Sequence, residues 1–216
     1  MQTVDAREQM IEQQVRAWDV RDERVLDVMR RVPRELFVPA SQRYRAYADD
    51  QVPLGHAQHM LRPSVAGRVL QALLPAGHET ALEIGAGSGF LTGCLAAMAG
   101  QVQALEIFPD LAASARANLD RLGARGASVC EADALQAADG RRYDVIAVTA
   151  SLPVYDPRFE RRLQVGGRLF VVVGVAPVME ARLVRRLTEE RFVTASLFET
   201  VLDPLINATR PEPFTF

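Results

Sequence analysis

Metal ligands and long apolar runs are both scarce in this chain. Only two cysteines and three histidines occur among its 216 residues, and their positions lack the spacing of a metal site, so no metal is expected. No apolar run is long enough to cross a bilayer, and residues 1–10 are polar and charged rather than the apolar core of a secretory leader. We therefore expect a cytoplasmic protein that does not contact a membrane.

Concentrated positive charge is also missing. The 25 basic and 27 acidic residues give a net charge of −2, without a basic run or interleaved basic and aromatic residues. Those features are typical of proteins that follow a phosphate backbone, so nucleic acid is not an expected partner. Cys94 and Cys130 fall within a predicted helix and a predicted strand. We expect both to be small buried residues rather than a disulfide or a catalytic thiol.

Apolar sequence is abundant, since 49% of the residues are hydrophobic, enough for the core of one α/β domain. Strand-like and helix-like stretches alternate after residue 63, which is typical of a parallel sheet. Helices are expected in two stretches before Pro33, in a segment capped by Ser64, and in two later segments, the last ending at Gly123. The first expected strand begins at residue 81, and the later ones cover residues 102–106, 128–131, 143–149 and 166–173.

The most informative local pattern is ALEIGAGSGF at residues 81–90, where an apolar strand breaks into three alternating glycines. Gly85, Gly87 and Gly89 can adopt positive φ and have no Cβ, so the backbone can turn sharply and approach a ligand closely. A dinucleotide fingerprint needs glycine at its first, third and sixth positions, and Phe90 occupies the sixth. We therefore expect a ligand that contains adenosine but is not a nicotinamide cofactor.

This pattern resembles the first motif of class I S-adenosylmethionine methyltransferases, which have an acidic residue, here Glu83, near the methionine end of the cofactor. Glu106 ends the next strand, where an acidic side chain accepts hydrogen bonds from the ribose hydroxyls. Asp133 follows the third strand, where these enzymes place a partner for the adenine edge. The expected cofactor-binding residues are Glu83, Gly85, Ala86, Gly87, Ser88, Gly89, Glu106, Ile107, Asp133 and Ala134.

A second set of motifs is more specific. Residues 22–26 (DERVL), 32–39 (VPRELFVP) and 52–55 (VPLG) precede the glycine loop, and 148–150 (VTA) follows it. With these motifs, most of the chain resembles the protein-L-isoaspartate O-methyltransferase family, which repairs age-damaged aspartyl and asparaginyl sites in proteins. The resemblance implies an α/β class I methyltransferase fold, Rossmann-like and doubly wound, with a mostly parallel sheet, an N-terminal helical extension and a C-terminal β-hairpin.

We expect a single methyltransferase domain over residues 1–216. Its parts are the N-terminal helices with the active-site loop (1–63), the cofactor-binding core (64–176), and the C-terminal hairpin with its tail (177–216). The spacing of apolar residues in 179–187 fits a strand and a helix equally well, and the family resemblance favours a strand of the hairpin. Residues 204–216 contain three prolines, and we expect them to form a loosely attached end.

The active-site loop departs from the family pattern. The family has Gly, Gln, Gly or similar, Gln, Thr, Ile, Ser, any residue and Pro, whereas residues 55–63 read GHAQHMLRP. Leu61 stands at the essential serine, whose hydroxyl orients the reacting carboxylate in the family, and leucine has no donor or acceptor for that role. His56 and His59 are available in the same loop as a base. Thr149 lies at the carboxyl edge of the sheet, where open α/β sheets bind ligands.

Three functions stay open on this sequence. The first is transfer of a methyl group from S-adenosylmethionine to isoaspartyl carboxylates of proteins or peptides, with S-adenosylhomocysteine as the product. The second is methylation of another protein site or an unidentified small acceptor, for which a histidine base becomes useful. The third is a noncatalytic module that binds the cofactor and a protein partner, with Leu61 in the apolar contact. The pattern predicts no oligomeric state.

Overall fold

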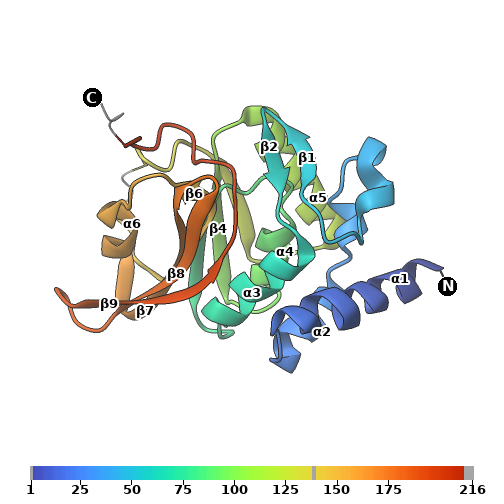
Figure 1. Cartoon of the computed structure of the whole chain (residues 1–216), viewed down its shortest axis with the longest axis horizontal. Helices are drawn as coiled ribbons and strands as arrows, with labels where there is room; N and C mark the ends of the chain where they lie inside the picture. The colour runs from blue at the N-terminus through green and yellow to red at the C-terminus, as the bar shows by residue number, and fades with distance from the viewer. Residues whose placement is uncertain (1, 138–139, 212–216) are drawn as a thin grey trace.

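The computed structural model describes residues 2–137 and 140–211. Its centre is a seven-stranded sheet in the order β5-β4-β3-β6-β7-β8-β9 (Figure 1). The pairs from β5 to β7 are parallel, and β8 and β9 extend the sheet as antiparallel strands. The predicted mostly parallel sheet and C-terminal β-hairpin are both confirmed. The strands are β3 (Thr80–Ile84), β4 (Gln101–Glu106), β5 (Ala127–Glu131), β6 (Tyr143–Leu152), β7 (Leu163–Val175), β8 (Val178–Arg186) and β9 (Phe192–Glu199).

The helices lie before and between these strands. The N-terminal helix α1 continues through a π-helical turn and a 3-10 turn, and further 3-10 turns follow α2. The helices are α1 (Gln2–Met10), α2 (Glu23–Arg31), α3 (Pro63–Leu73), α4 (Phe90–Ala96), α5 (Pro109–Leu122) and α6 (Pro157–Arg161). Between α2 and α3 lies a small hairpin of β1 (Val52–Gly55) and β2 (Gln58–Met60). None of the described helices has both the length and the apolar character needed to cross a membrane.

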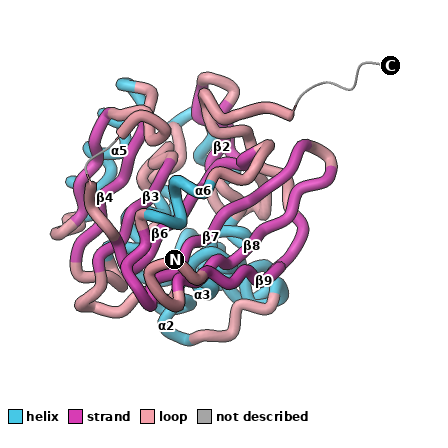
Figure 2. Tube along the Cα trace, turned by 90° about the vertical axis from the view of Figure 1, so that its left-hand side faces the viewer, coloured by secondary structure: helices cyan, strands magenta, loops and turns pink. Residues whose placement is uncertain are grey.

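The two faces of the sheet are covered by different elements. Because successive side chains of a strand point to opposite faces, Ala81 and Phe170 join one core with α3, α4 and α5, whereas Leu82 and Leu169 join another with α6. Figure 2 shows α6 lying over the sheet. Residues after β9 also pack against this second core.

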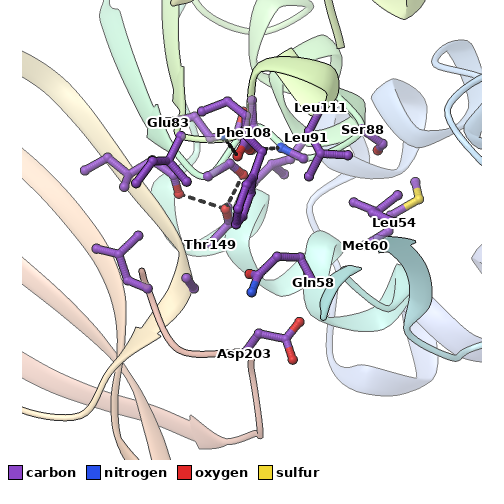
Figure 3. A pocket seen from close by; sticks show the side chains of 18 of the residues that line it. Leu54, Gln58, Met60, Glu83, Ser88, Leu91, Phe108, Leu111, Thr149 and Asp203 are labelled. Atoms are coloured by element: carbon purple, nitrogen blue, oxygen red, sulfur yellow. Dashed lines mark hydrogen bonds between the residues drawn. The ribbon is translucent and has the colours of Figure 1, made fainter. Parts of the chain in front are cut away.

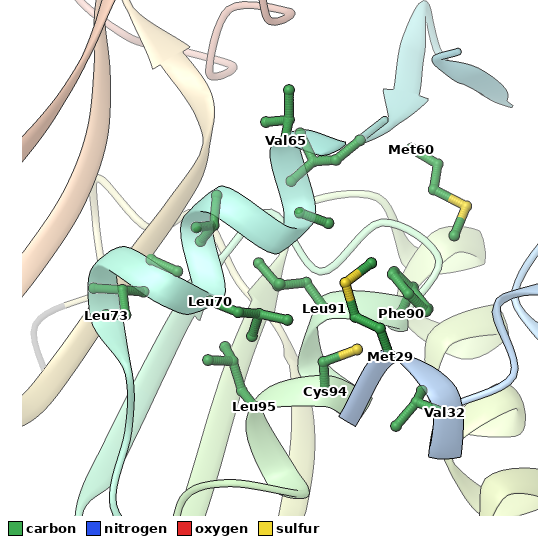
Figure 4. Close-up of a cluster of buried hydrophobic side chains, with 14 of the residues drawn as sticks. Met29, Val32, Met60, Val65, Leu70, Leu73, Phe90, Leu91, Cys94 and Leu95 are labelled. Carbon is green, nitrogen blue, oxygen red and sulfur yellow. The ribbon is translucent and has the colours of Figure 1, made fainter. Parts of the chain in front are cut away.

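The N-terminal helices pack on the first core. Asp22 caps α2 by accepting a hydrogen bond from the Arg24 backbone N–H. Met29 and Val32 then contact the buried side of α3 and α4 (Figure 4). A glycine at position 67 makes this approach possible, because a Cβ there would lie 2.7 Å from the Val15 side chain. The N-terminal extension is therefore an integral part of the core.

The order of the strands defines where a ligand fits. The chain proceeds outward from β3 to β4 and β5, then returns to β6 on the other side of β3. In open α/β sheets the crevice at such a reversal, beyond the carboxyl ends of the strands, is the ligand site. Glu83 and Glu106 lie at or next to these ends in β3 and β4. The sequence motifs therefore converge on one edge of the sheet.

The expectation of a loosely attached end is wrong for the described part of the tail. The Ser151 N–H donates to the Asp203 carbonyl at 2.8 Å, and the Leu205 N–H donates to the Ser151 carbonyl at 2.8 Å. Leu202 is buried. These bonds attach the tail to the carboxyl end of β6 like a short extra strand, and Pro204 takes its place there without needing an N–H. The remainder, residues 212–216, lies outside the described residues.

Two smaller expectations are also wrong. Ser64 does not cap α3, which begins at Pro63; its hydroxyl instead donates to Asp49 Oδ1 at 2.6 Å. Cys130 is exposed, whereas Cys94 is buried as expected. The physical reason is that β5 is an edge strand of the sheet, so the side chains at its border are not covered on every side.

Candidate active site

A pocket opens at the carboxyl edge of the sheet, over the glycine loop (Figure 3). In the view of Figure 3, Glu83 and Phe108 lie on one side, Gln58 and Asp203 on the other, and Thr149 between them. The lining residues come from the β1–β2 hairpin, the loop after β3, the ends of β4, β5 and β6, and the tail. They include Gln51, Gln58, His59, Leu61, Glu83, Gly85, Ala86, Gly87, Ser88, Glu106, Ile107, Phe108, Asp133, Ala134, Thr149, Leu202, Asp203, Leu205 and Ile206.

The glycine loop has the conformation that its sequence predicts. Gly85, Gly87 and Gly89 have φ values of 90°, 53° and 83°, a region in which side chains other than glycine are strained. Gly89 also lies against α5, since a Cβ at this position would be 3.2 Å from Ala115. Gly85 and Gly87 therefore present bare backbone to the pocket, whereas Gly89, also predicted to bind the cofactor, faces α5 and is not among the described lining residues.

Glu106 is fixed in place by the backbone around it. It is 5% exposed, and its two carboxylate oxygens accept hydrogen bonds from the N–H groups of Gly87 at 2.8 Å and Phe108 at 3.1 Å. A carboxylate oxygen can accept more than one hydrogen bond. Glu106 can therefore orient two hydroxyl groups of a ligand while the loop holds it still.

Glu83 is the most unusual group in the pocket. It is 1% exposed, and burial raises the pKa of its carboxyl from the ordinary 4.5 to about 8, while the nearby Glu106 acts in the same direction and the Thr92 hydrogen bond opposes them. The Thr92 hydroxyl donates to Oε2 at 2.5 Å. A buried carboxyl with only this neutral partner among the described residues is stabilised in its charged form by a positive ligand. This end of the pocket therefore fits a cationic group.

Asp133 and Thr149 are both engaged by the protein. Asp133 accepts hydrogen bonds from the Leu135 N–H at 2.9 Å and from the Asn207 side chain at 3.0 Å, so the tail is attached to this end of the site. The Thr149 hydroxyl lies 2.9 Å from the Ile84 carbonyl and 2.7 Å from the Gly85 carbonyl. Because a hydroxyl has a single proton, Thr149 can accept from a ligand but has none left to donate.

The β1–β2 hairpin carries the two loop histidines to different places. The His56 ring stacks on Phe108 with 4.1 Å between centroids, and its Nε2 lies 2.9 Å from Asp110 Oδ1. This hydrogen bond lowers the pKa of the Asp110 carboxyl. His56 thus attaches the hairpin to the start of α5 and does not line the pocket among the described residues. His59 lines the pocket.

His59 and Leu61, both predicted active-site residues, line the same pocket as Glu83. Asp203 Oδ2 accepts two hydrogen bonds from His59, one from the backbone N–H at 2.8 Å and one from the ring Nδ1 at 3.0 Å. Leu61 is 8% exposed and offers only carbon atoms to the pocket. Its backbone carbonyl accepts from the buried guanidinium of Arg34 at 2.6 Å.

The sequence missed the residues that the tail contributes. Leu202, Asp203, Leu205 and Ile206 all line the pocket. Asp203 lies 144 positions from His59 in the chain, so no local spacing could join them. The one available signal was an acidic residue beside a proline in an otherwise apolar stretch, which indicates no partner.

Comparisons with known proteins agree on one family. The family model for "Protein-L-isoaspartate(D-aspartate) O-methyltransferase (PCMT)" matches residues 5–209. A relative from Marinobacter nauticus named protein-L-isoaspartate O-methyltransferase 2 is 37% identical over 94% of this chain and 93% of its own. A relative from Methanoculleus marisnigri, named protein-L-isoaspartate O-methyltransferase, is 39% identical over 93% of this chain and 91% of its own.

A solved structure shows the same fold. It is described as a protein-L-isoaspartate O-methyltransferase from Plasmodium falciparum in complex with S-adenosyl-L-homocysteine, and it superposes with a TM-score of 0.80 at 19% identity. The match covers 92% of this chain and 97% of that one. The N-terminal helices, the parallel core and the C-terminal hairpin are therefore parts of one shared architecture.

Proposed function

This chain belongs to the protein-L-isoaspartate(D-aspartate) O-methyltransferase family, and on that premise we propose that it methylates isoaspartyl carboxylates in proteins, with S-adenosylmethionine as the donor. The observation that carries the proposal is a single pocket with two different ends. One end has the glycine loop, the fixed Glu106 and the buried Glu83, and the other is formed by the hairpin and the tail.

The residues at the first end fit the cofactor. In this proposal Glu106 accepts hydrogen bonds from the ribose hydroxyls, Asp133 and Ala134 border the adenine, and the glycine backbone contacts the bound cofactor. Glu83 supplies the negative charge that a sulfonium or an ammonium group needs. The bound cofactor contributes an electrophilic methyl group. The Plasmodium falciparum structure, described with S-adenosyl-L-homocysteine, supports the same ligand here.

The chain's own contribution is orientation and the exclusion of water. A carboxylate oxygen attacks the methyl carbon, the new C–O bond forms as the C–S bond breaks, and no proton moves. No general base is therefore required, and positioning of the acceptor carries most of the acceleration. Leu61 and Leu202 remove water from the acceptor end, which increases the strength of the electrostatic interactions around the reacting atoms.

Transfer of a labelled methyl group to an isoaspartyl hexapeptide tests the proposal, with the matching aspartyl peptide as the control. We expect methylation of the isoaspartyl peptide alone, and strong loss of cofactor affinity by calorimetry in Glu106→Ala. Tight cofactor binding without transfer to the isoaspartyl peptide contradicts the proposal. That result, together with methylation of a hydroxyl or phenol, establishes another acceptor; cofactor binding without transfer to any acceptor establishes the noncatalytic module.

A further inference from the structure

The charges around the pocket are strongly one-sided. Its described lining contains four carboxyl groups, those of Glu83, Glu106, Asp133 and Asp203, and no arginine. The chain has no lysine, so all 25 of its Lys and Arg residues are arginines. His59 is thus the only side chain in the described lining that can carry a positive charge. A carboxylate acceptor that enters this pocket is an anion entering an acidic site, and it needs a positive partner.

Hydrogen-bond donors are equally few at the acceptor end. Leu61 has none, and the Thr149 proton is directed at backbone carbonyls. The Gln51 amide donates to the Val201 carbonyl at 3.0 Å. Among the described lining residues, His59 and the amides of Gln51 and Gln58 keep side-chain N–H groups for an acceptor, because the Gln51 amide has a second proton and the Gln58 amide makes only a long 3.4 Å contact with the His56 carbonyl.

His59 is held in a fixed orientation. Its backbone N–H and its ring Nδ1 both bind Asp203 Oδ2, and Asp203 is itself held by the bond from Ser151 N–H to its carbonyl. The second ring nitrogen, Nε2, has no hydrogen-bond partner among the described residues. An imidazole oriented by a carboxylate at Nδ1 presents Nε2 for chemistry or binding.

We propose that His59, positioned by Asp203, donates a hydrogen bond from Nε2–H to the acceptor carboxylate, a bond that the Leu61 side chain cannot make. The Gln58 amide is a second donor to the same carboxylate. The inference rests on the proposed function, because it concerns the acceptor of that reaction. Asp203 acts as a positioning residue: it fixes the ring and offsets the charge of the imidazolium when no acceptor is present.

The proposal predicts the direction in which acceptor binding changes with pH. Nε2 carries a proton in addition to Nδ1 only in the imidazolium, so acceptor binding is strongest at low pH and weakens as His59 loses its proton. The ionisable groups around His59 in the described pocket are Asp203 beside it and Glu83, Glu106 and Asp133 further along, all of them acids. A histidine acting as a base gives the opposite result, since its rate rises as His59 loses its proton.

The test uses His59→Gln, with His78→Gln as the matched control, because His78 is exposed and outside the pocket. Binding of an isoaspartyl hexapeptide to the protein saturated with S-adenosylhomocysteine is measured by calorimetry from about pH 5 to about pH 9. KM and kcat for methyl transfer are measured over the same range. Asp203→Asn, which keeps one acceptor oxygen, is measured in parallel.

We expect His59→Gln to weaken peptide binding about tenfold to a hundredfold at the acidic end, as for a hydrogen bond to a charged group. In His59→Gln the pH dependence of peptide binding should vanish, KM should change more than kcat, and S-adenosylhomocysteine affinity should stay the same. Asp203→Asn should show a smaller loss of peptide affinity. An unchanged peptide affinity in His59→Gln overturns the inference about His59. If the wild type still transfers the methyl group to the isoaspartyl peptide, the proposed function stands. A rate that rises as His59 loses its proton also overturns it, in favour of a base.

Failure of the proposed function has a different signature. If the wild type binds the isoaspartyl peptide with the expected pH dependence and His59→Gln abolishes that dependence, but no methyl group is transferred, the inference stands and the proposed reaction is wrong. If the wild type binds no isoaspartyl peptide at any pH, both are overturned.

Discussion

Replacing Glu83 by glutamine should stabilise the ligand-free protein by an amount that grows with pH. The carboxyl is 1% exposed, and its pKa in the folded protein is about 8, against an ordinary 4.5. The folded state therefore holds this proton more tightly than the unfolded chain does. Stability from the raised pKa is complete below about pH 4.5 and is lost as pH rises towards 8.

The size of the effect follows from the two pKa values. Their difference of about 3.5 corresponds to about 5 kcal/mol at alkaline pH, and to about 3 kcal/mol at pH 7, where only part of the difference is expressed. Glutamine has nearly the same shape and never ionises, so Glu83→Gln removes this penalty. We expect the variant to match the wild type at about pH 4.5 and to exceed its unfolding free energy by several kcal/mol at about pH 9.

Urea unfolding of the ligand-free protein at a series of pH values measures this difference directly. Glu131→Gln is the matched control, because Glu131 likewise lies at the carboxyl end of a strand of the sheet but is exposed. Calorimetry should show that the wild type releases protons near neutral pH when it binds S-adenosylmethionine, and that Glu83→Gln binds more weakly without release. Equal pH dependence of stability in wild type and Glu83→Gln would refute the reasoning, because the charge of Glu83 would then carry no penalty.

Three further substitutions test other parts of the site. Gly89→Ala should lower the unfolding free energy by about 2 kcal/mol and weaken S-adenosylhomocysteine binding, because alanine is strained at φ 83° and its Cβ would lie 3.2 Å from Ala115. Urea unfolding measures the stability and calorimetry the affinity, and wild-type values of both would contradict this prediction. Leu61→Ser should raise kcat/KM for the isoaspartyl peptide up to about tenfold by adding a donor, and cost about 2–3 kcal/mol of stability through lost burial; an unchanged kcat/KM shows that position 61 does not face the acceptor. Ser64→Ala should cost about 1–3 kcal/mol in urea unfolding, because it removes the bond to Asp49, and a smaller loss shows that this bond contributes little.

Patterns that depend on neighbours in the sequence predicted the structure well. The glycine loop and the end of α5 at Gly123, where φ is 71°, both follow from local backbone preferences. The strands of the core follow from their apolar runs, and their carboxyl ends meet because parallel strands share an edge. These were sufficient to place Glu83 and Glu106 in one site.

Features that depend on distant parts of the chain were not predictable in the same way. The exposure of Cys130 follows from the strand order, which no local pattern specifies. The tail was misjudged because three prolines indicate a loose end, whereas its hydrogen bonds to Ser151 are made by residues on either side of Pro204. The hydrogen bond between His59 and Asp203 joins residues 144 positions apart, so it depends on how the tail packs against the hairpin.

A crystal structure of the protein with S-adenosylhomocysteine and an isoaspartyl hexapeptide tests the central claim most directly. We predict the cofactor product between Glu106 and Glu83, with the isoaspartyl carboxylate facing its sulfur and within hydrogen-bond distance of His59 Nε2. A peptide carboxylate bound away from the hairpin and tail, or a cofactor product outside the glycine loop, would contradict the account of a pocket with two ends.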